Sequence, residues 1–190
     1  MKPVPYILPY TELPCVTTRA LGEHYKLYLG YRDAVQKADQ ALEELRAPER
    51  FSLVDPYRLV SRARSTALAA VDLHEAYFSN LAAEPGTPSK ETLQALNTKY
   101  GSFAGWWREM RAATISARGW AVLGRYDCGD LDIFVLDDHD TGACFGYEAM
   151  IVLDTFEHAY FMDWGTDKVG YIDCLIKHLD WQEIERRFVK

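Results

Sequence analysis

Closely spaced cysteines are missing from this sequence of 190 residues. Its four cysteines, at positions 15, 128, 144 and 174, include no C-x-x-C pair, which argues against a zinc ribbon and against a disulfide framework. We therefore expect free thiols and a cytoplasmic location. No apolar run is long enough to span a bilayer, and three prolines interrupt the first ten residues, so we expect neither a signal peptide nor a membrane anchor.

Positive charge is also scarce. Lys and Arg total 21 against 28 Asp and Glu, which gives a formal net charge of −7. Because the two signs are interspersed, neither nucleic acid nor an anionic membrane is an expected partner. Internal repeats and low-complexity segments are absent. Hydrophobic residues make up 48% of the chain, enough for the core of one domain or of two small lobes.

The first half of the chain has the periodicity of two long helices. After an extended arm over residues 1–16, apolar residues recur at steps of three and four from Leu21 to Leu45, behind a threonine N-cap. A second stripe runs from Val60 to Leu81, behind an Asp-Pro pair that supplies an N-cap and a first-turn proline. Two such helices with a short connection predict an antiparallel hairpin.

Each of these stripes contains one histidine, His24 in the first and His74 in the second. A single buried imidazole is most often a core residue that is hydrogen-bonded to a carbonyl. Two imidazoles in facing stripes favour a shared metal ion, because a buried imidazole needs a partner and the ion satisfies both. Core histidines without a metal are the alternative.

The second half of the chain predicts a mixed lobe. A turn-rich segment over residues 84–89 separates a helical lobe (1–83) from this lobe (84–190). The predicted fold class is therefore α+β: an N-terminal antiparallel helical hairpin plus a C-terminal lobe with a three-stranded antiparallel sheet and surrounding helices, with the metal site between the lobes. The expected elements of this lobe are helices over 89–99 and 102–117, strands over 120–126, 131–136 and 147–153, and terminal helices over 169–177 and 181–188.

The third expected strand runs into a D-x-x-x-H motif. If the backbone turns helical there, Asp154 and His158 point at a common centre, which is half of a metal site. By itself the motif is more typical of an aspartate that caps a helix in front of a core histidine.

Several motifs resemble those of the iron/manganese superoxide dismutases, nearly from end to end of the chain. The stretch from Asp154 to Tyr160, D-T-F-E-H-A-Y, is similar to the family signature D-x-W-E-H-A-Y, which holds two metal ligands. The segment from Pro14 to His24 resembles P-x-I-S-x-x-T-x-x-x-H, and the segment around His74 resembles N-H-x-x-x-W-x-x-L. The resemblance thus implies four metal ligands in chain order, His24, His74, Asp154 and His158.

The resemblance also implies an activity. A superoxide dismutase would hold one Fe or Mn ion per chain, which superoxide reduces and reoxidises in turn to give oxygen and hydrogen peroxide. Three neutral imidazoles and one carboxylate form an N/O site that suits iron or manganese, and the sulfur ligands that favour zinc or copper(I) are absent. The E-H-A-Y match further implies a homodimer in which Glu157 reaches the partner's His158.

The residues around the ligands depart from the family pattern. The glutamine that holds metal-bound solvent in the family has no equivalent on the second helix, where Ala70 stands. The corresponding loop position is His139, which could donate the same hydrogen bond or be an ordinary surface histidine. Phe156 replaces the tryptophan beside the ligands and leaves Trp120 as the aromatic wall, and Phe161 replaces a family tyrosine.

The first helix is one residue shorter than in the family between the first ligand and a gateway tyrosine. Either Tyr28 or Tyr31 takes that tyrosine's role. An extra residue in a helix commonly forms a π-bulge near a functional site, and its absence here predicts a regular α-helix. The altered gateway motivates a second hypothesis, a superoxide-dismutase-like metal-binding protein with little or no turnover.

Overall fold

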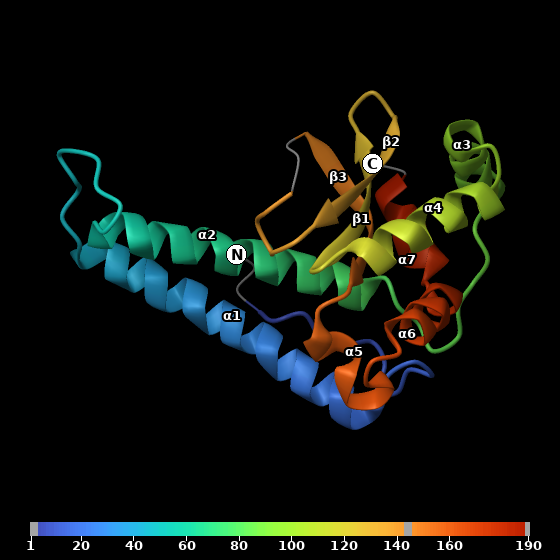
Figure 1. Ribbon diagram of the computed structural model, residues 1–190, viewed down its shortest axis with the longest axis horizontal. Coiled ribbons are helices and arrows are strands. Elements are labelled where there is room, and N and C mark those ends of the chain that lie inside the picture. Colours follow the sequence, from blue (N-terminus) through green and yellow to red (C-terminus); the bar gives the residue numbers. More distant parts are fainter. Residues whose placement is uncertain (1–3, 143–145, 189–190) are drawn as a thin grey trace.

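The structure is a computed structural model that describes residues 4–142 and 146–188. Two long antiparallel helices, α1 (Thr18–Glu44) and α2 (Pro56–Ser79), form a hairpin whose far end projects beyond the rest of the molecule (Figure 1). As predicted, α1 begins behind a threonine, since the Thr17 side chain accepts a hydrogen bond from Ala20 N, and Asp55 caps α2. Helix α1 is α-helical throughout, which confirms the predicted absence of a π-bulge.

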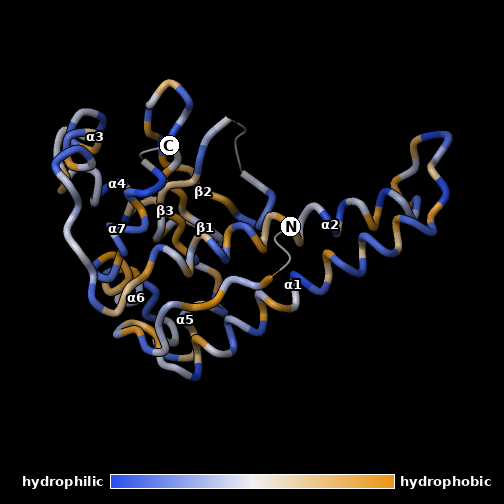
Figure 2. The backbone as a smooth tube through the Cα atoms, turned by 180° about the vertical axis from the view of Figure 1, so that it is seen from behind, coloured by the Kyte–Doolittle hydropathy of each residue, from blue (hydrophilic) through white to orange (hydrophobic). Residues whose placement is uncertain are grey.

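The two helices are amphipathic, and hydrophobic and hydrophilic residues alternate along both in Figure 2. Their buried stripes include both histidines: His24 is 2% exposed and His74 is fully buried. At the far end of the hairpin the connection carries exposed apolar side chains such as Phe51 and Val54. The two histidines lie on the buried stripes, near Asp154 at the end of β3.

A three-stranded sheet organises the second lobe. Its strand order is β2-β1-β3 and both pairings are antiparallel, as the sequence predicted. Trp120 at the start of β1 lies opposite Asp154 at the end of β3, so the register brings a tryptophan beside the candidate carboxylate ligand. The elements are α3 (Lys90–Tyr100), α4 (Phe103–Ser116), β1 (Trp120–Tyr126), β2 (Leu131–Leu136), β3 (Tyr147–Asp154), α5 (Glu157–Trp164), α6 (Lys168–Leu175), the 3-10 turn η1 (Ile176–His178) and α7 (Trp181–Phe188).

The sheet and the hairpin share one hydrophobic core. The central strand β1 is buried from Trp120 to Gly124, as is the second half of β3 from Met150 to Asp154. A side-chain hydrogen bond of 2.6 Å from Asn80, just after α2, to the Val152 carbonyl joins the hairpin to β3. The fold is therefore α+β with the sheet packed against the helices, which confirms the predicted fold class.

One prediction from the cysteines is wrong. Cys15 and Cys174 are joined as a disulfide, although free thiols were expected. Their separation of 159 residues leaves no local signal in the sequence, because only the packing of the chain start against α6 brings them together. Cys128 is free and exposed, and Cys144 lies outside the described residues. None of the helices in the described ranges is both long and apolar enough to cross a membrane.

Candidate metal centre

Four side chains from four different elements converge between the hairpin and the sheet. His24 comes from α1, His74 from α2, Asp154 from the end of β3 and His158 from α5. Asp154 Oδ2 lies 3.1 Å from His24 Nε2, 3.2 Å from His158 Nε2 and 3.8 Å from His74 Nε2. All four potential ligand atoms lie within 4.8 Å of one another. The sequence predicted this set, and the fold brings it together.

His158 Nε2 lies within hydrogen-bond distance of Asp154 Oδ2, but the other two imidazoles have no hydrogen bond to the carboxylate. Nε2 of His24 and Nε2 of His74 are buried and have no hydrogen-bond partner, although Asp154 Oδ2 is within 4 Å of both. Leaving two polar nitrogens unsatisfied in a protein interior costs several kcal/mol, roughly 1–3 each. A cation between the nitrogens and the carboxylate would satisfy all of them, so the donor set fits a metal ion.

Hydrogen bonding and burial keep the histidines in the form that binds metal. His74 Nδ1 donates to the Ala70 carbonyl across 2.7 Å, which leaves the Nε2 lone pair directed at the centre. Burial lowers the pKa of His74 to about 3 and also lowers the pKa of His24, so both are neutral near pH 7. Burial by itself raises the pKa of Asp154, but the imidazoles of His158 and His24 outweigh it and hold that pKa below its ordinary value.

Asp154 is held in place by contacts that the sequence did not predict. Its Oδ1 accepts a hydrogen bond of 2.9 Å from Phe156 N, and its carbonyl accepts one of 3.1 Å from the Tyr171 hydroxyl. The Tyr171 hydroxyl in turn lies 3.0 Å from that of Tyr77, a residue three positions after His74 on α2. Helical spacing from His74 could have indicated Tyr77, whereas nothing near Tyr171 in the sequence pointed to the site.

Aromatic rings enclose the histidines. The Trp120 ring lies edge-on to His74 with centroids 5.0 Å apart, and the Phe156 ring stacks on His158 at 5.2 Å. Trp120 and Phe156 also meet each other, at 6.0 Å. Both predicted aromatic residues therefore lie against the candidate ligands.

His139 lies beside the centre and is buried, not an ordinary surface histidine. Trp120 Nε1 donates a hydrogen bond of 3.1 Å to His139 Nδ1, and His139 Nε2 lies 2.8 Å from the Tyr31 hydroxyl. Because Nδ1 accepts, and because burial lowers the pKa of His139, the neutral ring carries its proton on Nε2. Burial and the charge of Asp154 raise the pKa of Tyr31, so its hydroxyl keeps its proton.

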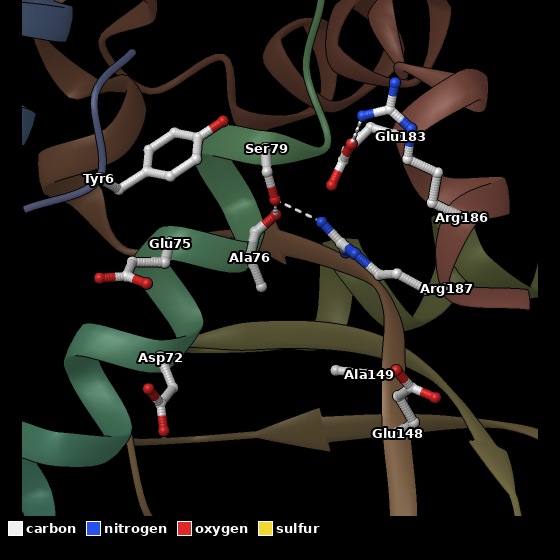
Figure 3. A pocket seen from close by; sticks show the side chains of 10 residues that line it. All are labelled: Tyr6, Asp72, Glu75, Ala76, Ser79, Glu148, Ala149, Glu183, Arg186 and Arg187. Carbon is white, nitrogen blue, oxygen red and sulfur yellow. Dashed lines mark hydrogen bonds and ion pairs between the residues drawn. The ribbon is translucent and has the colours of Figure 1, made fainter. Parts of the chain in front are cut away.

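The Tyr28 hydroxyl contacts Glu75 rather than His139. This buried hydroxyl donates to Glu75 Oε1 and accepts from Tyr6 N, each at 2.8 Å. Glu75 also lines a separate cleft of about 500 Å³, shown in Figure 3, with Tyr6 and Arg187 among its walls. None of the four candidate ligands lines this cleft. Of the two candidate gateway tyrosines, only Tyr31 contacts His139.

The outer face of α5 is open to solvent. Glu157 is exposed, Phe161 is 53% exposed and Met162 is 50% exposed, while the His158 side chain is 28% exposed. Phe161 therefore lies on the surface and makes no part of the enclosure around the histidines.

The chain is similar to known proteins over most of its length. A family model described as iron/manganese superoxide dismutases, C-terminal domain, matches residues 88–187. The superoxide dismutase (Fe) of Aquifex aeolicus is 33% identical over 178 residues, which cover 88% of this chain and 79% of that protein. The superoxide dismutase (Mn) of Haloarcula marismortui is 28% identical over 203 residues, covering 100% and 93%. The matching relatives include proteins named for iron and proteins named for manganese. Similarity therefore does not identify which of the two metals this chain binds.

Proposed function

Because this chain belongs to the iron/manganese superoxide dismutase family, we propose that it is a superoxide dismutase with one Fe or Mn ion per chain. Convergence of three imidazoles and one carboxylate, with two unpaired Nε2 atoms among them, is the observation that supports this most directly. In this proposal the metal ligands are His24, His74, Asp154 and His158. An ion held there would supply the one-electron reduction and oxidation by which two superoxides become oxygen and hydrogen peroxide.

Residues of the chain then supply the protons that hydrogen peroxide requires. His139 holds one proton on Nε2, next to the Tyr31 oxygen, and the half-buried Tyr31 holds another on its hydroxyl. The rings of Tyr31 and His139 both lie beside His74, with centroids 5.5 and 5.8 Å away, which supports a role of this pair in bringing protons to the centre. We therefore assign Tyr31 rather than Tyr28 to the gateway. Trp120 keeps His139 oriented, and with Phe156 it keeps bulk water away from the ligands.

We also propose that the protein is a homodimer in the cytoplasm. The exposed apolar residues on the outer face of α5 support an interface there, with Glu157 placed to reach the partner's His158. The partial exposure of the His158 side chain is consistent with such a contact from outside the chain. Fractionation of cells of the native host would test the location.

The function is tested by purifying the protein from its native host, measuring Fe and Mn, and assaying superoxide removal. We expect about one metal ion per chain and turnover that scales with metal content. Near-stoichiometric metal without turnover would instead support the alternative, a metal-binding protein of the same family without dismutase activity. Chelation followed by reconstitution with each metal separately identifies which one is active.

A further inference from the structure

Cys15, Cys174 and His178 form a second cluster of potential metal ligands, and none of them belongs to the metal centre. Cys15 and Cys174 are joined as a disulfide with their Cα atoms 5.6 Å apart. His178 Nδ1 lies 3.2 Å from Cys15 Sγ and 3.9 Å from Cys174 Sγ. The three ligand atoms lie within 4.8 Å of one another, so the imidazole already faces both sulfur atoms.

The cluster joins the start of α1 to the C-terminal helices. Cys174 lies in α6 and His178 follows four residues later in η1, so one helical turn puts both on the same side. Cys15 comes from the other end of the chain, three residues before α1, where Trp164 Nε1 donates a hydrogen bond of 2.7 Å to its carbonyl. Cys15 is 3% exposed, and Cys174 and His178 are half-buried.

We propose that these three residues bind a soft divalent cation such as Zn²⁺ when the disulfide is reduced. Thiolate and imidazole are the ligands that zinc prefers, at distances of about 2.0–2.3 Å. This inference rests on the proposed cytoplasmic location, because paired cysteines with a nearby histidine in a reducing compartment are more typical of metal sites than of structural disulfides. Three protein ligands leave the fourth tetrahedral position to solvent. The ion would tie α1, which carries His24, to α6.

A dithiol reductant supplies the electrons and protons that reduce the Cys15–Cys174 disulfide. Two electrons and two protons pass from the dithiol to the disulfide, which becomes two thiols while the dithiol becomes a disulfide. On metal binding each thiol loses its proton to solvent. In the disulfide form His178 Nδ1 donates its proton to the Cys174 carbonyl, 3.0 Å away. Binding the ion moves that proton to Nε2 and frees Nδ1 to coordinate.

The two sites differ in the softness of their ligands, and this makes the second one measurable. The metal centre offers only nitrogen and oxygen atoms, whereas the cluster offers two sulfurs. Co²⁺ substituted for Zn²⁺ gives a near-ultraviolet sulfur-to-cobalt charge-transfer band only where thiolates bind it. The band therefore reports the cluster even if the metal centre also takes up cobalt, and its outcome does not depend on dismutase activity.

The experiment uses the full chain with Cys128→Ser and Cys144→Ser, so that no other thiol contributes. The protein is loaded with Mn²⁺, reduced with a phosphine that does not compete for metal, and titrated with Co²⁺. We expect the band to saturate at about one Co²⁺ per chain and to disappear when Zn²⁺ is added. The oxidised form of the same chain should show no band. Absence of the band in the reduced chain would overturn the proposal and leave a disulfide only.

Two variants identify the ligands. Cys15→Ser removes one of the two thiolates and should reduce the band by at least half. His178→Gln should weaken Co²⁺ binding by about tenfold or more, because loss of even an outer-shell partner of a ligand costs about that much. A band that keeps its full intensity in Cys15→Ser would show that the sulfurs come from elsewhere and would refute the site. The comparison of oxidised and reduced protein needs neither substitution, so the result holds even if a variant fails to fold.

Discussion

Trp120 Nε1 donates a hydrogen bond of 3.1 Å to His139 Nδ1, and that single contact sets the direction of the His139 proton. Because Nδ1 accepts, Nε2 carries the hydrogen and meets the Tyr31 hydroxyl at 2.8 Å. A tryptophan from β1 thus orients a loop histidine toward a tyrosine from α1.

Replacing His139 should slow turnover without removing metal. His139→Ala leaves the Trp120 N–H without its acceptor and interrupts the path from Tyr31, so we expect kcat to fall by about 10²-fold, the low end for loss of a proton-transfer group. His139→Gln should recover much of the rate, because the amide oxygen accepts from Trp120 and the amide N–H donates to Tyr31. Pulse radiolysis gives the rates, and metal analysis checks the content. Loss of metal in His139→Ala would contradict the assignment.

The two tyrosines should separate function from stability. Tyr31→Phe removes the hydroxyl beside His139 and should lower kcat by about 10-fold or more while the unfolding free energy changes little. Tyr28→Phe removes a buried partner of Glu75 and should cost about 1–3 kcal/mol of unfolding free energy with kcat nearly unchanged. Steady-state rates and urea unfolding of both variants test this. The opposite pattern would show that Tyr28, and not Tyr31, is the gateway tyrosine.

Substitution of a candidate ligand should empty the metal centre. We expect His24→Ala to contain less than about a tenth of the wild-type metal. Loss of an outer-shell partner of a ligand already weakens metal binding by about 10- to 100-fold, and loss of one of the four ligands should weaken it at least as much. Elemental analysis after purification measures this, with His139→Gln as a control that keeps all four ligands. Unchanged metal in His24→Ala would mean that the ligand assignment is wrong.

The metal-free protein should lose stability as pH falls below about 6.5. Burial lowers the pKa of His74 to about 3 and lowers that of His24, so the unfolded chain takes up protons that the folded chain does not. The unfolding free energy therefore falls with decreasing pH through this window, by up to about 1.4 kcal/mol per pH unit for each histidine. Urea unfolding of chelated protein between about pH 7.5 and 5 measures the slope, and His74→Gln should flatten it. A slope that is unchanged in His74→Gln would show that other groups cause it.

The proposed dimer should depend on the outer face of α5. Glu157→Ala removes the carboxylate proposed to reach the partner's His158, and Phe161→Ser removes exposed apolar area beside it. We expect the double variant to sediment as a monomer at micromolar concentration, where the wild-type chain is a dimer. Glu43→Ala, at an exposed position on α1, is the matched control and should stay dimeric. A wild-type chain that sediments as a monomer would refute the interface.

Local patterns predicted most of the fold. The threonine and Asp55 caps, the apolar stripes and the strand boundaries all depend on residues within a few positions of one another, and the structure reproduces them. The stripes also placed His24 and His74 on buried faces, because a residue's direction on a helix follows from its position modulo 3.6. Periodicity can predict which face of a helix is buried because this depends on the sequence of a single element.

By itself, then, the sequence determined which elements form, which faces they bury and which four side chains are candidates for the metal. Only the tertiary structure decided among residues that share a face or lie far apart. Tyr28 and Tyr31 both follow His24 on α1, yet only Tyr31 meets His139. Cys15 meets Cys174, and Tyr171 meets Asp154, across 159 and 17 residues. These choices depend on how whole elements pack, and packing is a property of many distant contacts together rather than of any one stretch of chain.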